Sequence, residues 1–312
     1  MSPATLAKNR VTTMAAKRRG RPINGWIVLD KPSGLTSARA VEQVKRLTGA
    51  AKAGHAGTLD PLATGVLPIA LGEATKVVAR IVDARKRYRF TLRWGEERDT
   101  DDADGRPVEA SERRPSRAEV AAALQGFIGE IWQRPPTYSA IKVAGERAYE
   151  LARAGRPVEL PARPVEISSF ERLDDAADPD RAEFAVACGK GAYVRSLARD
   201  LGRVLGCFAH VESLRRTLVG PFGEETAISL DKLAELLHKV ALDDALHPVE
   251  AALADIPALV VTGSEAARLR SGQAVRVPST KQGTVCAMAE GRPVALARIE
   301  GGEVRPVRVF NL

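Results

Sequence analysis

An aspartate followed directly by a proline lies in the most unusual segment of the sequence, GHAGTLDPLATG at residues 54–65. The proline restricts the backbone of Asp60 to extended or turn conformations, and the surrounding glycines favour a loop. A carboxylate held in this way can project from rigid backbone into a cleft, as a nucleophile or a general base must. Asp-Pro is also an ordinary turn dipeptide. The segment alone therefore leaves two interpretations open, a catalytic aspartate and an aspartate that only caps a turn.

Several other kinds of site are excluded by what the sequence lacks. Gly57-Thr58-Leu59-Asp60 is not followed by the Gly-Lys-Ser/Thr ending of a phosphate-binding P-loop. Neither a second carboxylate nor a Ser-His-Asp arrangement stands near Asp60. The three cysteines, Cys188, Cys207 and Cys286, are too few and too scattered for a disulfide framework or a metal cluster. We therefore expect reduced thiols and no metal site.

Hydrophobic periodicity predicts the elements that must position this loop. Polar and apolar residues alternate over 87–94, which predicts a strand with Arg87, Arg89 and Arg93 on one face. The acidic stretch at 96–104 is expected to be a loop. Further strands are expected at 26–29, 66–71, 164–173 and 182–188, and helices at 38–48, 73–82, 116–127, 146–154, 193–205 and 230–239. Because strands and helices alternate without βαβ regularity, the pattern predicts an α+β fold with a mixed sheet.

The last part of the chain has a different pattern. Residues 248–257 are expected to form a linker between two prolines. Short β segments separated by glycine-rich turns follow, at 274–278, 284–289, 294–299 and 304–310. They predict a small β barrel or sandwich packed against the main domain.

Composition and charge narrow the class of protein. The 312 residues are 45% hydrophobic and 28% charged, which is typical of a folded globular chain. No stretch approaches the roughly 20 apolar residues of a membrane helix, and the N-terminus lacks the apolar core of a signal peptide. The formal charge is +8, and residues 1–23 hold six basic residues and no acidic one. Such a tail suits contact with a polyanion such as nucleic acid. A solvated leader and an organellar transit peptide are the alternatives.

Five blocks of the sequence resemble, in the same order, the TruB family of tRNA pseudouridine synthases. The blocks are NGWIVLDKPSGLTS at 24–37, GHAGTLDPLATGVLPIALGEATK at 54–76, KRYRFTLRWGEERDTDDADG at 86–105, PPTYSAIKVAGERAYELARAG at 135–155 and GKGAYVRSLARDLGRVLGCFAHVESLRR at 189–216. Chance agreement across five ordered blocks is negligible. The resemblance implies isomerisation of uridine to pseudouridine at position 55 in the T loop of tRNA, without a cofactor or a metal. It also implies a mixed-sheet pseudouridine synthase catalytic domain at 24–250 and a small PUA-like RNA-binding β domain at 256–312. The basic tail at 1–23, expected to be disordered, is not part of the family core.

The resemblance also assigns roles to individual residues. Asp60 matches the essential aspartate of the family, which either attacks C1′ of the ribose or removes a 2′ proton; the sequence leaves both open. Tyr88 matches the tyrosine that stacks on the target base and helps to deprotonate it, the alternative being a core aromatic. Arg195 matches the arginine that pairs with the catalytic carboxylate and would fix its orientation. The alternative interpretation of Arg195 is a surface arginine at the start of a helix.

Five further residues match substrate-binding positions of the family. Tyr193 and Leu214 match the pocket that receives the base, although a leucine is more often simply part of a core. His55 matches a histidine that displaces a base pair and holds the RNA loop, the alternative being a structural histidine. Lys31 and Pro32 match a motif that braces the catalytic loop.

The implied partner is the T arm of tRNA, bound by a cytoplasmic monomer that needs neither a membrane nor a guide RNA. A uridine stacked in a tRNA arm must be flipped into the pocket, at a cost of a few kcal/mol. Two rival functions remain: a guide-RNA-dependent relative, similar to the box H/ACA enzymes, and a non-catalytic RNA chaperone. The inserts at 96–115 and 124–155 argue against the first, and an intact Asp60, Tyr88 and Arg195 argue against the second.

Overall fold

A mixed β-sheet forms the centre of the computed structural model, which describes residues 20–156, 158–173, 178–239, 242–278 and 282–312. The predicted basic tail at 1–23 therefore lies outside the described residues except for 20–23. Within the described part of the chain the sheet has nine strands, in the order β1-β3-β12-β4-β11-β10-β7, with β2 paired to β3 and β13 paired to β12. The strands are β1 (Gly25–Lys31), β2 (Ala53–His55), β3 (Thr64–Leu71), β4 (Lys86–Trp94), β7 (Gly129–Gln133), β10 (Arg163–Arg172), β11 (Arg181–Cys188), β12 (Ala209–Val219) and β13 (Phe222–Gly223).

One pairing makes the sheet mixed. β12 runs parallel to β3 on one side and antiparallel to β4 on the other, and the other pairings along the path are antiparallel. Among the described residues, the part of the sheet that carries β3 is thus joined to the part that carries β4 only through β12, which comes more than a hundred residues later in the chain. This arrangement confirms the predicted α+β fold with a mixed sheet.

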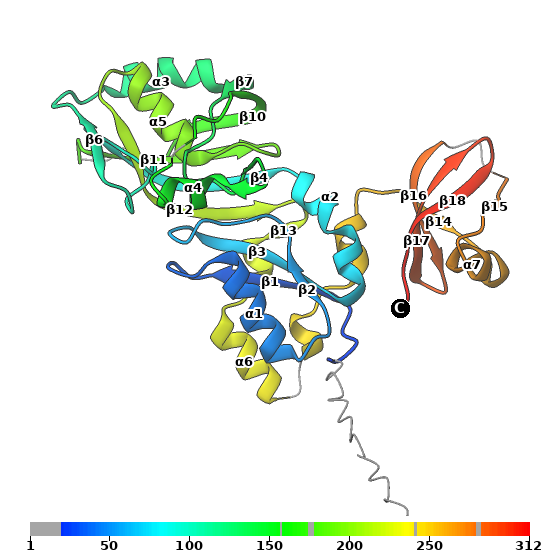
Figure 1. Cartoon of the computed structure of the whole chain (residues 1–312). Coiled ribbons are helices and arrows are strands. Elements are labelled where there is room, and N and C mark those ends of the chain that lie inside the picture. The colour runs from blue at the N-terminus through cyan, green and yellow to red at the C-terminus, as the bar shows by residue number, and fades with distance from the viewer. Residues whose placement is uncertain (1–19, 157, 174–177, 240–241, 279–281) are drawn as a thin grey trace, which may run out of the picture.

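Most of the helices and the short hairpins lie around this sheet, and the last helix lies in a separate C-terminal lobe (Figure 1). The helices are α1 (Ser37–Thr48), α2 (Val78–Asp83), α3 (Arg117–Leu124), α4 (Ala148–Arg153), α5 (Val194–Val204), α6 (Leu230–His238) and α7 (Gly263–Arg270), with the 3-10 helix η1 (Gly72–Val77) before α2. The hairpins are β5 (Glu96–Arg98) with β6 (Pro107–Ala110), and β8 (Lys142–Val143) with β9 (Glu146–Arg147). Among the described residues no helix is long and apolar enough to cross a membrane.

Local sequence signals explain where several helices begin and end. Ser116 and Glu119 form the predicted capping box at the start of α3. Gly49, with φ 70°, adopts the left-handed conformation that ends α1. The side chain that caps the start of α1 is that of Thr36, which accepts a hydrogen bond from the backbone N–H of Arg39. The neighbouring hydroxyl of Ser37 is thereby left to bind the loop that carries Asp60.

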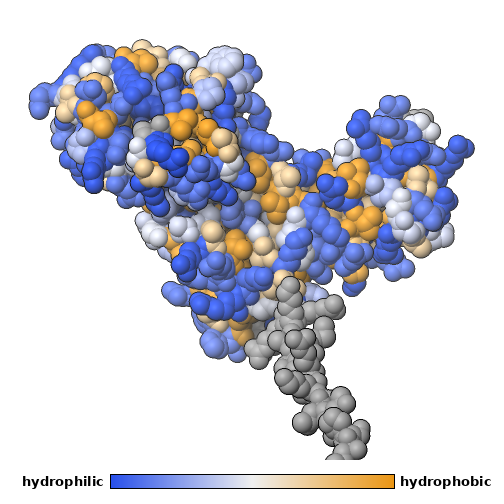
Figure 2. Space-filling view, in the orientation of Figure 1, coloured by the Kyte–Doolittle hydropathy of each residue, from blue (hydrophilic) through white to orange (hydrophobic). Residues whose placement is uncertain are grey.

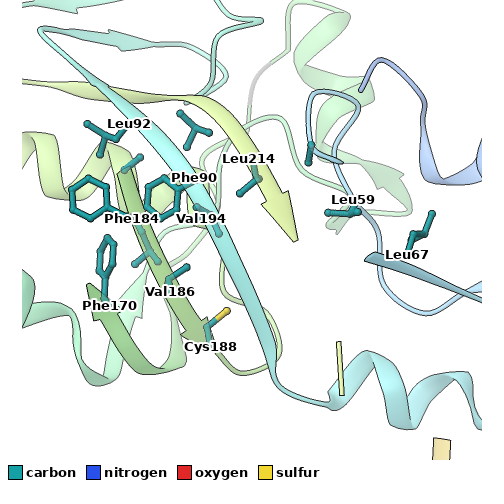
Figure 3. Packing of buried hydrophobic residues seen from close by; sticks show 14 of the residues in the cluster. Leu59, Leu67, Phe90, Leu92, Phe170, Phe184, Val186, Cys188, Val194 and Leu214 are labelled. Carbon is teal, nitrogen blue, oxygen red and sulfur yellow. The ribbon is translucent and has the colours of Figure 1, made fainter. Parts of the chain in front are cut away.

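The main core lies between the sheet and helices α1, α3, α5 and α6. Phe90 on β4 stacks on Phe184 of β11 at 5.4 Å between ring centroids and lies 5.9 Å from Phe170 of β10. Figure 3 shows these rings together, with Leu214 between them and the loop that carries Leu59. The opposite face of β4 presents Arg87, Arg89 and Arg93, which share one face as predicted and are exposed. The aromatic cluster thus packs against the buried face of β4. One end of this strand approaches the loop that carries Asp60.

A second sheet forms a separate lobe at the C-terminal end (Figure 1). Its strand order is β14-β16-β17-β18-β15, and α7 packs against it. The strands are β14 (Ala258–Val260), β15 (Val275–Arg276), β16 (Gly283–Ala289), β17 (Arg292–Glu300) and β18 (Glu303–Val309). Its buried Cys286 and Phe310 join Trp26 and Val28 of β1 in one hydrophobic cluster. Figure 2 shows hydrophobic residues at the surface between the two lobes, where this cluster lies.

Two sequence predictions were wrong in this description. The acidic stretch at 96–104 begins as strand β5 instead of a loop, because Glu96–Arg98 pairs with residues 107–110. The predicted linker at 248–257 contains a short 3-10 helix, Val249–Leu253, whose Val249, Ala252 and Leu253 are buried in the cluster between the lobes. A linker would leave these apolar side chains in water, whereas here they join the two sheets.

Candidate active site

The loop between β2 and β3 carries Asp60, and three buried side chains hold its backbone. The Ser37 hydroxyl accepts a hydrogen bond from the Leu59 N–H at 2.8 Å and donates one to the Leu59 carbonyl at 3.0 Å. Lys31 Nζ donates to the Pro61 carbonyl at 3.2 Å. Arg216 Nη2 donates to the Gly57 carbonyl at 3.1 Å. These buried side chains therefore fix the backbone on both sides of Asp60, while the Asp60 carboxylate itself stays about one third exposed.

The Asp60 carboxylate pairs with Arg195, in the first turn of α5. The distance from Arg195 Nε to Asp60 Oδ2 is 2.8 Å, and the arginine side chain is only 5% exposed. Its Nη1 donates to the Thr100 carbonyl at 2.8 Å and its Nη2 to the Tyr138 carbonyl at 3.0 Å. Burial alone would lower the pKa of Arg195, but the carboxylates of Asp60 and Asp102 raise it above its ordinary value. The guanidinium is thus a fixed positive charge that orients the Asp60 carboxylate.

A second carboxylate completes this group. Asp102 Oδ2 lies 3.5 Å from Arg195 Nη1, and its other oxygen accepts from the Thr100 hydroxyl at 2.6 Å. Burial raises the pKa of Asp102, and the charge of Arg195 opposes that shift. Its neighbour Asp101 pairs with the buried Arg199 at 2.9 Å, and burial raises its pKa to about 7. The acidic stretch that sequence patterning treated as a loop therefore supplies buried partners to two arginines of α5.

Asp60 lies where two cavities meet. Both cavities are lined by Thr58, Leu59, Asp60, Ala140 and Arg195. One, of about 330 Å³, is also lined by Tyr88, Tyr193, Leu214 and Arg216. The other, of about 480 Å³, is lined by His55, Thr36, Arg147, Tyr149 and Arg153 among others. A molecule in either cavity would reach the same carboxylate.

Two tyrosines, Tyr88 and Tyr193, line the smaller cavity. Tyr88 is half-buried on β4, and burial raises the pKa of its phenol while the charge of Arg216 opposes the shift. Tyr193 is held by Gln133, whose side-chain amide accepts from the Tyr193 N–H at 2.7 Å and donates to its carbonyl at 3.1 Å. The Arg163 guanidinium lies 5.4 Å from the centre of the Tyr193 ring. The two tyrosines and the carboxylate suit a flat, polar ring that has to be held near Asp60.

The remaining residues named from the sequence lie elsewhere. His55 lines the larger cavity, where its Nδ1 is buried and has no hydrogen-bond partner among the described residues. Burial lowers the pKa of His55, and the charges of Arg216 and Arg147 lower it further. Lys31 and Pro32 line neither cavity. Lys31 is fully buried beneath the loop, and Pro32, itself exposed, supplies one of the carbonyls that Lys31 binds.

Two residues of the site were not singled out from the sequence. Asp102 stands in an acidic run, whose usual environment is water, and nothing in the spacing marks one of its members as buried. Arg216 was missed for the same reason. An arginine is almost never fully buried unless it is paired, so nothing in the sequence indicated that this one lies in the interior. Both lie inside the quoted blocks, so their position beside motif residues was the only available signal. Among the described residues no group of three or more His, Cys, Asp or Glu side chains could hold a metal ion.

Lys31 provides a test of how the loop is held. Its Nζ donates to the carbonyls of Pro32, Leu35 and Pro61, so Lys31→Met leaves three acceptors without this donor. We expect the free energy of unfolding to fall by about 2 kcal/mol at pH 7, since an unpaired buried polar group costs about 1–3 kcal/mol. Urea denaturation measures the change, with the exposed Lys45→Met as the matched control.

The same variant has a defined pH dependence. Burial lowers the pKa of Lys31 from 10.5 to about 8, with Asp60 opposing the shift. Between these two values the unfolded chain binds a proton that the folded chain does not, so stability contributed by Lys31 rises with pH across this window. The destabilisation by Lys31→Met should therefore be larger at pH 10 than at pH 7. An equal effect at both values would show that Lys31 keeps an ordinary proton affinity in the fold.

Comparisons with known proteins cover nearly all of the described chain. Three family models match in succession: the TruB family pseudouridylate synthase N-terminal domain at 45–194, the tRNA pseudouridylate synthase B C-terminal domain at 195–254, and the tRNA pseudouridine synthase II C-terminal domain at 256–311. The chain is 58% identical over 305 residues to a protein of Bradyrhizobium diazoefficiens named tRNA pseudouridine synthase B, covering 95% of this chain and 88% of that one. It is 52% identical over 310 residues to the protein of the same name from Caulobacter sp. strain K31, covering 96% of this chain and 100% of that one.

Solved structures are similar to the whole fold. A chain in an H/ACA RNP bound to a substrate RNA containing 2′-deoxyuridine superposes with a TM-score of 0.72 at 28% identity, covering 92% of this chain and 85% of that one. A chain in the archaeal box H/ACA sRNP Nop10-Cbf5 complex gives a TM-score of 0.70 at 28% identity, covering 92% and 86%. The similarity therefore extends over most of the chain.

Proposed function

Because this chain belongs to the TruB family of pseudouridine synthases, we propose that it isomerises the uridine at position 55 in the T loop of tRNA. The chain is a tRNA pseudouridine synthase, an isomerase that converts uridine in tRNA to pseudouridine. In this reaction the bond between N1 and C1′ breaks, the base turns over, and C5 is joined to C1′. The proton on C5 is lost and N1 regains one, so the composition of the RNA does not change.

The observation that carries the proposal is the Asp60 carboxylate, held by the buried Arg195 at the junction of two cavities. We assign the smaller cavity to the flipped uridine and the larger one to the RNA strand beside it. Asp60 acts on the ribose, either at C1′ or at the 2′ proton, and both roles require an ionised carboxylate. Arg195 supplies the charge that stabilises that ionised form and fixes its direction.

Tyr88, Tyr193 and Leu214 form the walls that hold the base in this proposal. Stacking on an aromatic side chain suits an unpaired base, since every base has a flat face to offer. Tyr88 is also placed to take part in removal of the C5 proton, as the family resemblance implies. His55, with Arg147 and Arg153 across the larger cavity, holds the displaced RNA strand. Lys31 and Pro32 act on the loop instead of the RNA, because they line neither cavity.

The regions of the chain are assigned accordingly. We assign residues 24–250 to the catalytic domain and 256–312 to a PUA-like RNA-binding domain that grips the acceptor side of the tRNA. The separate five-stranded sheet and the match of a C-terminal family model to 256–311 support this division. The enzyme is proposed to act in the cytoplasm as a monomer and without a guide RNA, although the similar solved chains come from H/ACA complexes.

Release of tritium from a tRNA transcript tests the substrate, the position and the independence from a guide RNA together. The transcript carries tritium at C5 of a single uridine, and purified protein is added without guide RNA. We expect release when the label is at position 55 and none when it is at other T-loop or anticodon-loop uridines. Release only after addition of a guide RNA would support the H/ACA-like alternative, and no release with tight tRNA binding would support the chaperone.

A further inference from the structure

Arg216 is a fully buried arginine at the centre of the sheet. Its residue exposure is 1%, and it lies on β12 beside Gly65 of β3 and Tyr88 of β4. Its neighbour Arg215 points the other way, toward Asp30 and Glu224 at the surface. Two consecutive arginines of one strand thus have opposite environments.

The guanidinium of Arg216 is held by carbonyl groups from two segments. Nε donates to the Val66 carbonyl at 2.8 Å, on β3. Nη2 donates to the Gly57 carbonyl at 3.1 Å and Nη1 to the Thr58 carbonyl at 3.4 Å, on the loop. No ion pair between Arg216 and a carboxylate is present among the described residues. A buried charge whose partners are main-chain carbonyls of the two ends of one loop acts as a fixed brace for that loop.

The brace lies two residues before the catalytic carboxylate. Gly57, with φ 103°, adopts a conformation that L-residues rarely take and turns its carbonyl toward Arg216. Thr58 follows, and Asp60 comes two residues later. A shift of the Arg216 side chain would therefore move the start of the loop, and with it the carboxylate.

Arg216 reaches Tyr88 as well. The two residues are neighbours in the pairing of β12 with β4, and both line the smaller cavity. The charge of Arg216 lowers the pKa of Tyr88, against the larger effect of burial. The other groups that face this phenol are Cys188 on β11 and Asp60 on the loop, both of which raise the pKa, with Lys86 on β4 beside Cys188.

We propose that Arg216 is a positioning residue of this active site, which fixes the Asp60 loop against Tyr88 and stabilises negative charge on the tyrosine oxygen. One side chain would then couple the group that acts on the ribose to the group that faces the base. The effect on turnover rests on the proposed function, whereas the effect on the tyrosine oxygen does not.

Three variants test the proposal. Arg216→Gln removes the charge and most of the donors. Arg216→Lys keeps the charge, but a single ammonium cannot reach carbonyls on both β3 and the loop with the same geometry. Arg215→Gln is the matched control, because it makes the same change one residue away on the exposed face of the same strand. Circular dichroism and thermal unfolding establish that each variant is folded.

The first measurement is single-turnover tritium release together with the dissociation constant for tRNA. For Arg216→Gln we expect turnover to fall by about 100-fold, the loss typical of a misplacement of about 1 Å, while tRNA affinity changes by less than about threefold. Arg216→Lys should also lose most of its turnover, and Arg215→Gln should keep it.

The second measurement reads the tyrosine directly and needs no RNA. A fluorinated tyrosine, whose phenol is more acidic, is placed at position 88, and its ionisation is followed by fluorine NMR as the pH is raised. Removing the charge of Arg216 should raise the pH of half-ionisation in Arg216→Gln, whereas Arg216→Lys should stay near the parent value. A role confined to folding would leave this midpoint unchanged.

The outcomes separate the two proposals. Wild-type turnover in Arg216→Gln, or an unshifted phenol midpoint in that variant, would overturn the assignment of Arg216. If Arg216→Gln does not fold, Arg216→Lys provides the test. Full turnover in Arg216→Lys would show that Arg216 does not fix the Asp60 loop, and low turnover with a near-parent phenol midpoint would support that role. If the parent chain releases no tritium from tRNA, the proposed function fails, but the phenol midpoints still test the contact of Arg216 with Tyr88.

Discussion

Asp60→Asn is expected to abolish tritium release from tRNA labelled at C5 of the T-loop uridine. Asparagine has nearly the same shape and can still approach Arg195, but it is neither a nucleophile nor a base of useful strength. We expect a loss of at least about 10⁴-fold in the single-turnover rate, comparable in kind to removal of a catalytic nucleophile elsewhere. Binding should change little, because in the proposed function Asp60 acts on the reacting nucleotide, at the junction of the two cavities.

The control for this experiment is Asp231→Asn, which removes one carboxylate from the exposed start of α6. Its turnover should match that of the unmodified chain. The dissociation constant of Asp60→Asn for tRNA is measured at the same salt concentration, since phosphate contacts make affinity strongly salt-dependent. If affinity fell as far as turnover, Asp60 would be a positional residue and its assignment to the chemical step would be wrong.

Arg195→Met is expected to lower turnover by about 10²- to 10³-fold and to destabilise the fold by about 3–5 kcal/mol, the usual cost of removing one partner of a buried ion pair. The arginine side chain is 5% exposed, and it lies between the carboxylates of Asp60 and Asp102. Without it the buried Asp102 has no ion-pair partner in the part of the chain that the structure describes, and Asp60 loses the group that orients it.

The stability of this variant should depend on pH in a defined direction. Burial already raises the pKa of Asp102, and loss of Arg195 removes the charge that opposes the shift. Between the unfolded and the folded pKa the folded state holds a proton that the unfolded state does not, so stability falls as pH rises through that window. The deficit of Arg195→Met should thus be larger at pH 8 than at pH 5. Arg39→Met is the comparison variant and should show no such trend, because Arg39 on α1 and its partner Glu42 are both exposed.

Sequence patterning predicted the elements whose side chains alternate or repeat regularly. β4 and α3 are examples, because one has a strict polar-apolar alternation and the other a complete capping box. β12 was not predicted as a strand, although it lies at the centre of the sheet. Its pairing with β4 is irregular between Val211 and Ser213 and again between Arg216 and Leu218, so the alternation of its faces is broken twice.

The residues of the site also fall into two groups, those predicted from the sequence and those that were missed. Asp60, Tyr88, Arg195, Tyr193 and Leu214 were named from motifs, and the fold places all five around one cavity. Asp102 and Arg216 were missed because each is a charged residue buried by partners that lie far away in sequence. Arg195 is 93 residues from Asp102, and the carbonyls that hold Arg216 are about 150 residues from it. Pairing of this kind depends on the tertiary fold, and no local pattern contains it.

The place of β12 in the sheet has a consequence for how the protein is made. Asp60 and Tyr88 are synthesised early, yet the strand that joins β3 to β4 ends only at Val219. Until that strand has left the ribosome, the two parts of the sheet are not paired through β12, and the Asp60 loop lacks Arg216. Contacts that close over such long stretches of chain form slowly, because the entropy of the intervening segment must be lost first. Assembly of the active site is therefore a late event in biosynthesis. A chain interrupted before residue 219 contains the Asp60 motif but cannot complete the strand that positions it.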